Sequence, residues 1–184
     1  MSERDSILVP LAEGFEEIEA VAIIDVLRRA ELPVVVAGLS PGPITGSHGI
    51  ALQTDCELDQ VDRARIRAIC LPGGMPGTTH LMQDERILAL VRELDSKQLV
   101  TAAICAAPMV LAAAGVVDGV RVTSHPSVRG KLGSASVVDS PRVVQSEHIL
   151  TSQGPGTAIE FALSVVRELR GPELADQLAE AMLA

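Results

Sequence analysis

The chain has 184 residues, of which 47% are hydrophobic, so it can bury one full core over residues 1–184 and is short for two domains. Its net charge of −9 disfavours a nucleic-acid-binding surface, because phosphate contacts need clustered lysine and arginine. The only aromatic residues are Phe15 and Phe161, so stacking platforms for bases and aromatic cages for sugars are poorly supported.

Cysteine and histidine usage argues against a disulfide framework and a metal centre. The three cysteines are odd in number and form no CxxC pair, as expected in a reducing compartment. The four histidines show no close ligand spacing, and neither GxGxxG nor a P-loop is present. The apolar runs are too short for a signal or a membrane span. We therefore expect a cytoplasmic protein with no metal, no cofactor and no membrane contact.

Strand-like and helix-like segments alternate along the chain. In chain order, the expected elements are a strand over 7–11, a helix over 15–30, a strand over 33–38, a hairpin segment over 46–52, a strand over 66–71, helices over 78–82 and 85–94, a strand over 99–104, a helix over 108–114, short β-pieces over 120–123, 135–138 and 143–145, a strand over 148–152 and two final helices marked by apolar residues at helical spacing. Continuous apolar strands separated by helices predict an α/β fold with a doubly wound, mostly parallel sheet and helices on both faces.

Polar or glycine-rich turns follow four of the predicted strands. They are Glu13-Gly14, Pro72-Gly73-Gly74, the turn at Cys105 and the segment 153–156. In open parallel sheets, ligands bind outside the carboxyl ends of the strands. These four turns should therefore meet at one edge of the sheet.

Cys105 ends an apolar strand and begins a helix. Pro108 suits the first helical turn, which places Cys105 at the positive end of a helix dipole, where thiolate is favoured over thiol. The same turn presents the nucleophile in α/β-hydrolases. The alternative is a small buried residue in a strand, which is how we interpret Cys70, whereas Cys56 in its polar segment is incidental.

A glutamate interrupts the apolar face of the first helix. Phe15, Glu19, Ala22 and Val26 follow helical spacing, so Glu19 lies in the middle of the stripe. A desolvated glutamate stays protonated near neutrality and can donate a hydrogen bond to a thiolate. The alternative is a glutamate at the rim of the core, bonded to backbone. Glu16 and Glu17, in the first turn, are expected to be solvated caps that favour the helix dipole.

Several further features admit a functional and a structural interpretation. Gly73-Gly74 presents N–H groups suited to an oxyanion, although Pro-Gly-Gly is also a common turn. The turn over 154–156 could cradle an anion at a helix start. His125 follows a short strand and is either a base near the thiol or a surface residue. On the other sides of the first helix, the apolar residues Ile18, Val21 and Ile24 hint at a partner chain.

Together these segments resemble the ThiJ/PfpI superfamily, in the branch of the Parkinson-associated protein deglycase and its bacterial relatives. The matching motifs are, in family order, LAEGFEEIEAV (11–21), LPGG (71–74), AICAAP (103–108), TSHP (123–126) and LTSQGPGT (150–157). The resemblance implies a flavodoxin-like α/β sandwich that forms a homodimer. It also implies a conserved cysteine at Cys105, a protonated Glu19, oxyanion-binding amides at Gly74 and Ala106, and a histidine near the thiol at His125.

The resemblance also implies a function. This branch is credited with cofactor-independent conversion of methylglyoxal to lactate, a glyoxalase activity, and with deglycase repair of early glycation adducts on proteins. Oxidative-stress sensing, in which the same cysteine is oxidised, is the alternative, and a non-catalytic binding domain is a third possibility. His48 and Gln153 stand where arginines line the pocket entrance in one animal pattern. Ala106 replaces the histidine of the intracellular-protease branch, which argues against peptidase activity.

Overall fold

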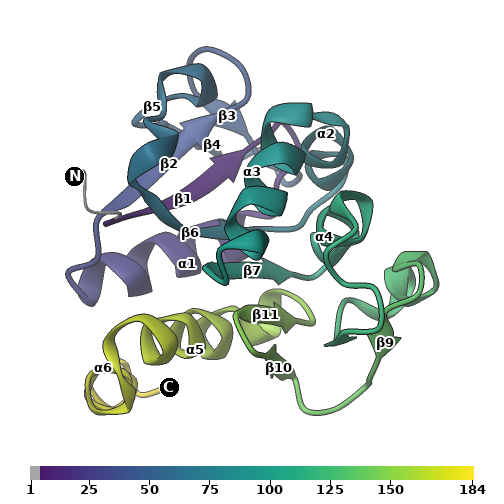
Figure 1. Ribbon diagram of the computed structural model, residues 1–184. Coiled ribbons are helices and arrows are strands. Elements are labelled where there is room, and N and C mark those ends of the chain that lie inside the picture. The colour runs from purple at the N-terminus through teal and green to yellow at the C-terminus, as the bar shows by residue number, and fades with distance from the viewer. Residues whose placement is uncertain (1–4) are drawn as a thin grey trace.

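A seven-stranded sheet forms the centre of the protein, whose computed structural model describes residues 5–184 (Figure 1). Its strands are β1 (Ser6–Leu11), β2 (Val34–Gly38), β5 (Cys56–Glu57), β6 (Ile66–Leu71), β7 (Val100–Ile104), β10 (Val143–Ser146) and β11 (Ile149–Ser152). They lie in the order β10-β11-β7-β6-β1-β2-β5, and every pair is parallel except β10–β11. Two small two-stranded sheets accompany it, namely β3 (Ile44–Thr45) with β4 (Ala51–Leu52) and β8 (Arg121–Val122) with β9 (Ser136–Val137).

Helices cover both faces of the sheet (Figure 1). They are α1 (Glu17–Arg29), α2 (Gly77–Gln83), α3 (Glu85–Ser96), α4 (Pro108–Ala114), α5 (Ala158–Arg170) and α6 (Pro172–Met182). Alternate side chains of β1 point to opposite faces, so Leu8 packs in one core with α2, α3 and α4, whereas Ile7 and Val9 pack in the other with α1 and α5. The inner strands are buried on both faces, which explains their continuous apolar runs.

The strand order confirms the predicted fold class. The parallel strands β2-β1-β6-β7-β11 follow the 2-1-3-4-5 order of flavodoxin-like folds. Because β1, β6, β7 and β11 are parallel neighbours, the turns that follow them meet at one edge of the sheet, as predicted. The hairpin expected over 46–52 is present as β3–β4.

The sequence did not predict β5, and the first helix begins later than expected. β5 is two residues long, contains Cys56 and lies beside β2 at the edge of the sheet, in a segment without an apolar run. Helix α1 begins at Glu17 rather than at residue 15, because Glu16 has an extended backbone and caps the helix. Cys70 is fully buried in β6, as predicted, and burial raises the pKa of its thiol to about 12.

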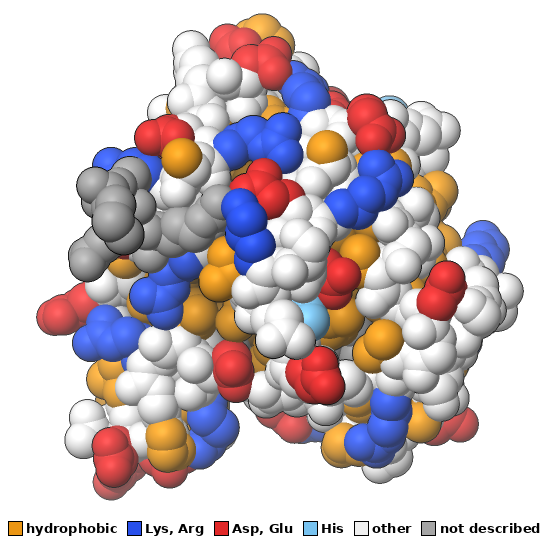
Figure 2. Space-filling view, viewed as in Figure 1, with side chains coloured by type: hydrophobic (Ala, Val, Ile, Leu, Met, Phe, Trp, Pro, Cys, Tyr) orange, Lys and Arg blue, Asp and Glu red, His pale blue; other side chains and the backbone are white. Residues whose placement is uncertain are grey.

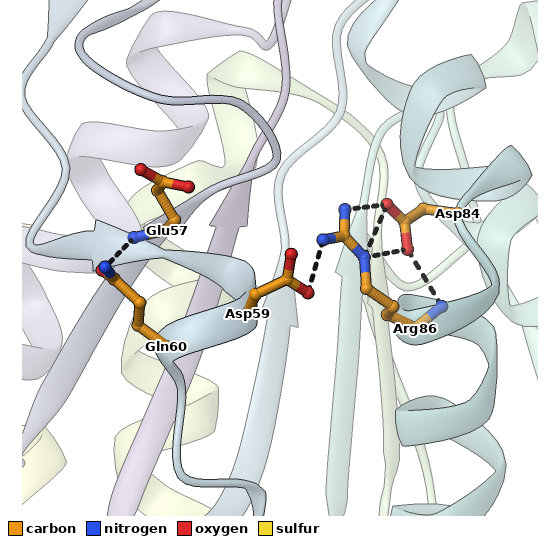
Figure 3. Close-up of polar contacts among 5 residues, drawn as sticks. All are labelled: Glu57, Asp59, Gln60, Asp84 and Arg86. Carbon is orange, nitrogen blue, oxygen red and sulfur yellow. Dashed lines mark hydrogen bonds and ion pairs between the residues drawn. The ribbon is translucent and has the colours of Figure 1, made fainter.

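Figure 3 shows the contacts that tie the segment after β5 to the start of α3. The Arg86 guanidinium donates to Asp84 on one side and, from Nη1, to Asp59 Oδ1 at 2.7 Å on the other. Asp84 also caps α3 by accepting the Arg86 N–H at 2.9 Å. In the adjoining turn, the Glu57 N–H donates to Gln60 Oε1 at 3.1 Å. This cluster connects the edge of the sheet to α3.

On the face in Figure 2, acidic and basic side chains are interspersed among hydrophobic ones. Exposed ion pairs of the protein include Arg92 with Glu85 at 2.7 Å and Arg142 with Glu160 at 2.6 Å. Each such pair contributes little to stability. Among residues 5–184, no helix combines the length and the apolar character needed to span a membrane.

Candidate active site

Cys105 occupies a strained turn between β7 and α4. Its φ of +63° lies in the left-handed region, which side chains other than glycine rarely adopt. Two hydrogen bonds hold this backbone: its N–H donates to Ser152 O at 2.9 Å, and its carbonyl accepts the His125 N–H at 2.8 Å. Residues held in such conformations by their surroundings cluster at functional sites. The predicted strand-to-helix turn is therefore present, and Cys105 is partly exposed.

Glu19 lies beneath this turn and is completely buried. Its Oε2 accepts the Gly73 N–H at 2.7 Å, and the carboxyl also interacts with the Cys105 thiol. Its Oε1 is buried without a hydrogen-bond partner among the described residues. Burial raises the pKa of Glu19 to about 7, and the negative charge of Glu16 adds to this rise. Glu19 therefore holds a proton in the near-neutral range and can donate it toward the sulfur.

The acidity of Cys105 differs from the sequence-based expectation. Burial raises the pKa of the thiol to about 12, and the negative charge of Glu19 adds to this rise. The N–H groups of Ala106 and Gly74 act in the opposite direction by donating toward the sulfur. The prediction that the helix start alone favours thiolate is wrong, because burial and the Glu19 charge together raise the pKa of the thiol. Ionised Glu19 therefore opposes the thiolate, and a proton on Glu19 removes that part of the rise.

The Gly73-Gly74 turn fits between the start of α1 and Cys105. A Cβ on Gly73 would lie 2.8 Å from Cys105 Cβ and 2.9 Å from Glu19 Oε2. Gly74 has a φ of +93°, and a Cβ there would lie 2.3 Å from the backbone nitrogen of Glu16. Only glycine fits either position. The structure thus brings the amides of Gly74 and Ala106 together at the sulfur.

His125 is linked to Cys105 through its backbone. Its side chain is exposed, and Nδ1 bonds to Ser127 Oγ at 2.8 Å and accepts the Ser127 N–H at 3.3 Å. The imidazole therefore caps the short helix Pro126–Lys131, as in the structural interpretation. Nε2 has no hydrogen-bond partner among residues 5–184. In the neighbouring turn over 154–156, the Gly154 N–H donates to Thr157 Oγ1 at 3.2 Å. This N–H, a candidate anion donor in the sequence, is therefore already engaged within the chain.

Glu16 and Glu17 are not solvated caps, because the β3–β4 hairpin covers them. Glu16 does cap α1, but it is 7% exposed, and Glu17 is 4% exposed. Glu17 Oε1 accepts the His48 N–H at 2.6 Å, and Oε2 lies 2.9 Å from His48 Nδ1. Burial alone raises the pKa of Glu17, but these hydrogen bonds from His48 lower it to about 2. The Glu17 carboxylate in turn raises the pKa of His48.

Two further positions bear on ligand binding. Glu16, Glu17 and His48 bring one potential metal ligand each within 4.8 Å of one another, but hydrogen bonds within the chain already engage both carboxylates. Gln153 Nε2 donates to Asp139 O at 2.7 Å and to Thr123 Oγ1 at 3.2 Å. These contacts hold the Gln153 amide against neighbouring loops.

Comparison with known proteins identifies the family. The family model described as DJ-1/PfpI family matches residues 5–168. The chain belongs to the DJ-1/PfpI family. Protein dj-1beta of Drosophila melanogaster is 41% identical over 180 residues, which cover 97% of this chain and 96% of that protein. The glutathione-independent glyoxalase DJR-1.2 of Caenorhabditis elegans is 37% identical over 179 residues, covering 96% of this chain and 95% of that protein.

Solved structures agree with this placement in the DJ-1/PfpI family. The crystal structure of Drosophila melanogaster DJ-1beta has a TM-score of 0.94 at 40% identity and covers 100% of this chain and 99% of that one. Toxoplasma gondii DJ-1 in an oxidized form has a TM-score of 0.92 at 35% identity, with 97% of this chain and 98% of that one covered.

Sequence reasoning missed the part that Glu16 plays in this DJ-1/PfpI site. The signal was present, because an acidic residue three positions before Glu19 matches the spacing of a capping box. The sequence interpretation treats Glu16 only as a favourable charge at a helix start. Helix periodicity gives no sign that the Gly73 backbone bonds to both Glu16 and Glu19.

Proposed function

We propose that this DJ-1/PfpI protein is a cofactor-independent glyoxalase that converts methylglyoxal and related 2-oxoaldehydes to hydroxy acids, with deglycase activity on early glycation adducts of proteins. The observation that carries the proposal is the partly exposed Cys105 next to the fully buried Glu19, both lying against Gly73, with the backbone N–H groups of Gly74 and Ala106 lowering the pKa of the thiol. A similar protein of Caenorhabditis elegans is named a glutathione-independent glyoxalase.

The reaction begins when Glu19 keeps its proton and Cys105 loses its own. The thiolate adds to the aldehyde carbon, and the oxyanion of the hemithioacetal accepts hydrogen bonds from the N–H groups of Gly74 and Ala106. Glu19 gives its proton to this oxyanion and becomes a carboxylate, which then takes the proton from the same carbon and leaves an enediolate. The hydroxyl proton of the first carbon moves to the oxygen of the second, and Glu19 returns the abstracted proton to the second carbon. The adduct becomes a thioester, which water hydrolyses to the hydroxy acid and the free thiol.

His125 is an auxiliary base in this proposal. Its Nδ1 is engaged by Ser127, so Nε2 is the atom left for proton transfer to water or to the leaving thiol. Because the ring also caps a short helix, we expect substitution of His125 to reduce turnover less than substitution of Cys105 or Glu19.

Steady-state kinetics test this proposal. Lactate should form from methylglyoxal without glutathione, and Cys105→Ser and Glu19→Gln should each lower kcat/KM by at least about a hundredfold. Cys56→Ser is the matched control, since Cys56 lies on the edge strand β5, and it should leave the rate unchanged. Turnover by Cys105→Ser at the wild-type rate would refute the proposal.

Redox sensing is the second candidate, and the exposure of Cys105 favours it. Cys105 is partly exposed next to a proton donor, whereas Cys70 is fully buried. A similar structure, that of Toxoplasma gondii DJ-1, is described as oxidized. Peptide mass analysis after mild peroxide treatment separates the two candidates. Oxidation confined to Cys105 together with negligible turnover supports the sensor, and rapid turnover with slow oxidation supports the enzyme.

We also propose that the protein is a homodimer in the cytoplasm. Four apolar side chains are exposed on one surface formed by α1, the β3–β4 hairpin and the start of α5, namely Ile18, Val21, Ile50 and Ile159. An apolar surface of this kind is typical of an interface between subunits. The three cysteines are free, as in proteins of a reducing compartment. Light scattering tests the subunit count, and a monomer at micromolar concentration would contradict the dimer.

A further inference from the structure

Three hydrogen bonds form a closed ring beneath the Cys105 turn. The Glu16 N–H donates to Gly73 O at 2.9 Å, the Gly73 N–H donates to Glu19 Oε2 at 2.7 Å, and the Glu19 N–H donates to Glu16 Oε2 at 2.7 Å. In an ordinary capping box, the two end residues of the helix turn bond to each other directly. Here the bond from the Glu19 N–H to the Glu16 side chain is direct, but the return bond is replaced by two bonds through the Gly73 backbone, so the ring joins the start of α1 to the turn beside the thiol.

The ring places the Glu16 carboxylate next to the Glu19 carboxyl in a buried environment. Glu16 is 7% exposed and Glu19 is fully buried, so water screens the two groups poorly. The groups that face Glu16 are Glu17 and Glu19 on its own helix and His48 of the β3–β4 hairpin, while Cys105 of the β7–α4 turn faces Glu19. Burial is the main cause of the raised pKa of Glu19, and the Glu16 charge adds to it.

Capping alone does not explain a glutamate at this position. The preferred residues at a helix N-cap are serine, threonine, aspartate and asparagine, whose short side chains reach the same backbone N–H. A glutamate supplies the cap and, in addition, a negative charge within one turn of Glu19. That charge opposes ionisation of Glu19 and leaves the proton on its carboxyl.

We propose that Glu16 is a positioning residue of the Cys105 site: its carboxylate fixes Glu19 through the Gly73 ring and keeps the proton on Glu19, so that the sulfur carries the negative charge. The consequence for turnover rests on the proposed function, whereas the consequence for thiol reactivity does not. Glu16 touches neither the sulfur nor the substrate in this proposal, and it acts only through Glu19.

The test measures the rate at which iodoacetamide alkylates Cys105 between pH 5 and pH 9. A Cys56→Ser background removes the other accessible thiol, since Cys70 is fully buried. Glu16→Gln keeps an oxygen that can cap α1 but removes the charge, and Glu16→Asp keeps both. Glu17→Gln is the matched control, because Glu17 is an equally buried glutamate of the same turn whose carboxylate bonds to the β3–β4 hairpin instead.

If Glu16 acts through its charge, Glu16→Gln moves the ionisation of Glu19 to lower pH by about one unit. The alkylation rate of Cys105 at pH 7 then falls about tenfold, because the proton moves from Glu19 to the sulfur. Glu16→Asp and Glu17→Gln should stay within about threefold of the parent rate. A purely structural cap predicts instead that Glu16→Gln and the parent protein react at the same rate.

Two results would overturn the inference. One is an unchanged alkylation profile in Glu16→Gln, and the other is an equal fall in Glu17→Gln. If Glu16→Gln does not fold, Glu16→Ser provides a short cap without charge. Its alkylation rate at pH 7 should fall by the same factor. Failure of the proposed function is distinguishable: a parent protein that makes no lactate, but whose thiol responds to Glu16→Gln as expected, refutes the glyoxalase and supports the role of Glu16.

Discussion

Replacing Glu19 by glutamine should flatten the dependence of folding stability on pH. The pKa of Glu19 in the folded protein is raised from 4.5 to about 7, mainly by burial. Between these two values the unfolded chain loses this proton while the folded chain keeps it, so the free energy of unfolding decreases as the pH rises. The stabilisation is complete below pH 4.5 and is lost by the time the pH has passed about 7. Glutamine does not titrate, so the variant lacks this contribution.

The size of the effect follows from the shift. A change from 4.5 to about 7 corresponds to about 3 kcal/mol, of which about 2 to 3 kcal/mol falls between pH 5 and pH 8. Urea unfolding of the wild type and Glu19→Gln at one protein concentration measures this slope at each pH. All other titrating groups are common to both proteins, so the difference between the two curves isolates Glu19.

The reasoning predicts that Glu19→Gln gains stability relative to wild type by that amount from pH 5 to pH 8. A constant offset between the two proteins would reflect altered packing or hydrogen bonding and leaves the prediction intact, because the prediction concerns the slope. Parallel curves over this range would refute it. They would mean that Glu19 is already ionised near pH 5 and cannot donate a proton to Cys105.

Three further predictions concern the surroundings of the site. Gly74→Ala should destabilise the fold by about 3 kcal/mol or more in urea, because of its positive φ and a 2.3 Å backbone contact, whereas Gly130→Ala, with open space around it, should change stability by less than about 0.5 kcal/mol. Glu17→Gln should be less stable than wild type near pH 6. The difference in free energy of unfolding should shrink as the pH falls from 4.5 toward 2, because the wild-type carboxylate becomes protonated in that range and loses its stabilisation. A difference that stays constant over this pH range would contradict the prediction. Ile18→Lys should produce monomers in light scattering if the exposed face of α1 is the subunit interface.

The fold and the centre of the site were predictable because they depend on local pattern. Apolar runs of strand length and helical spacing predict the parallel sheet with helices on both faces, whereas its flavodoxin-like order came only from the family resemblance, and Pro108 after Cys105 marks the strand-to-helix turn. Glu19 was identifiable as a candidate because a glutamate in the middle of an apolar stripe is rarely fully buried without a partner, although the pattern alone left a position at the rim of the core open. Strand β5 was not predictable, since its two residues, Cys56 and Glu57, are too few to form an apolar run or an alternating pattern.

The remaining features depend on contacts between distant segments. Glu16 and Glu17 are buried by the β3–β4 hairpin, and Glu17 bonds to His48, 31 residues away. The acidity of Cys105 depends on desolvation by the assembled core and on the charge of Glu19, neither of which is present in the local turn. Helix position alone therefore predicted the wrong direction for the thiol.

The most direct test of the central claim is to identify the residue that binds the substrate carbon during turnover. The wild type and Glu19→Gln are mixed with methylglyoxal without glutathione, quenched with acid to slow loss of the thiol adduct, and analysed at once by intact-protein mass and by peptide mass after digestion at acidic pH. The account predicts an adduct on Cys105 in both proteins, which accumulates in Glu19→Gln because the proton transfer that follows addition is slowed. Adducts on lysine and arginine alone, with Cys105 unmodified while lactate forms, would contradict it.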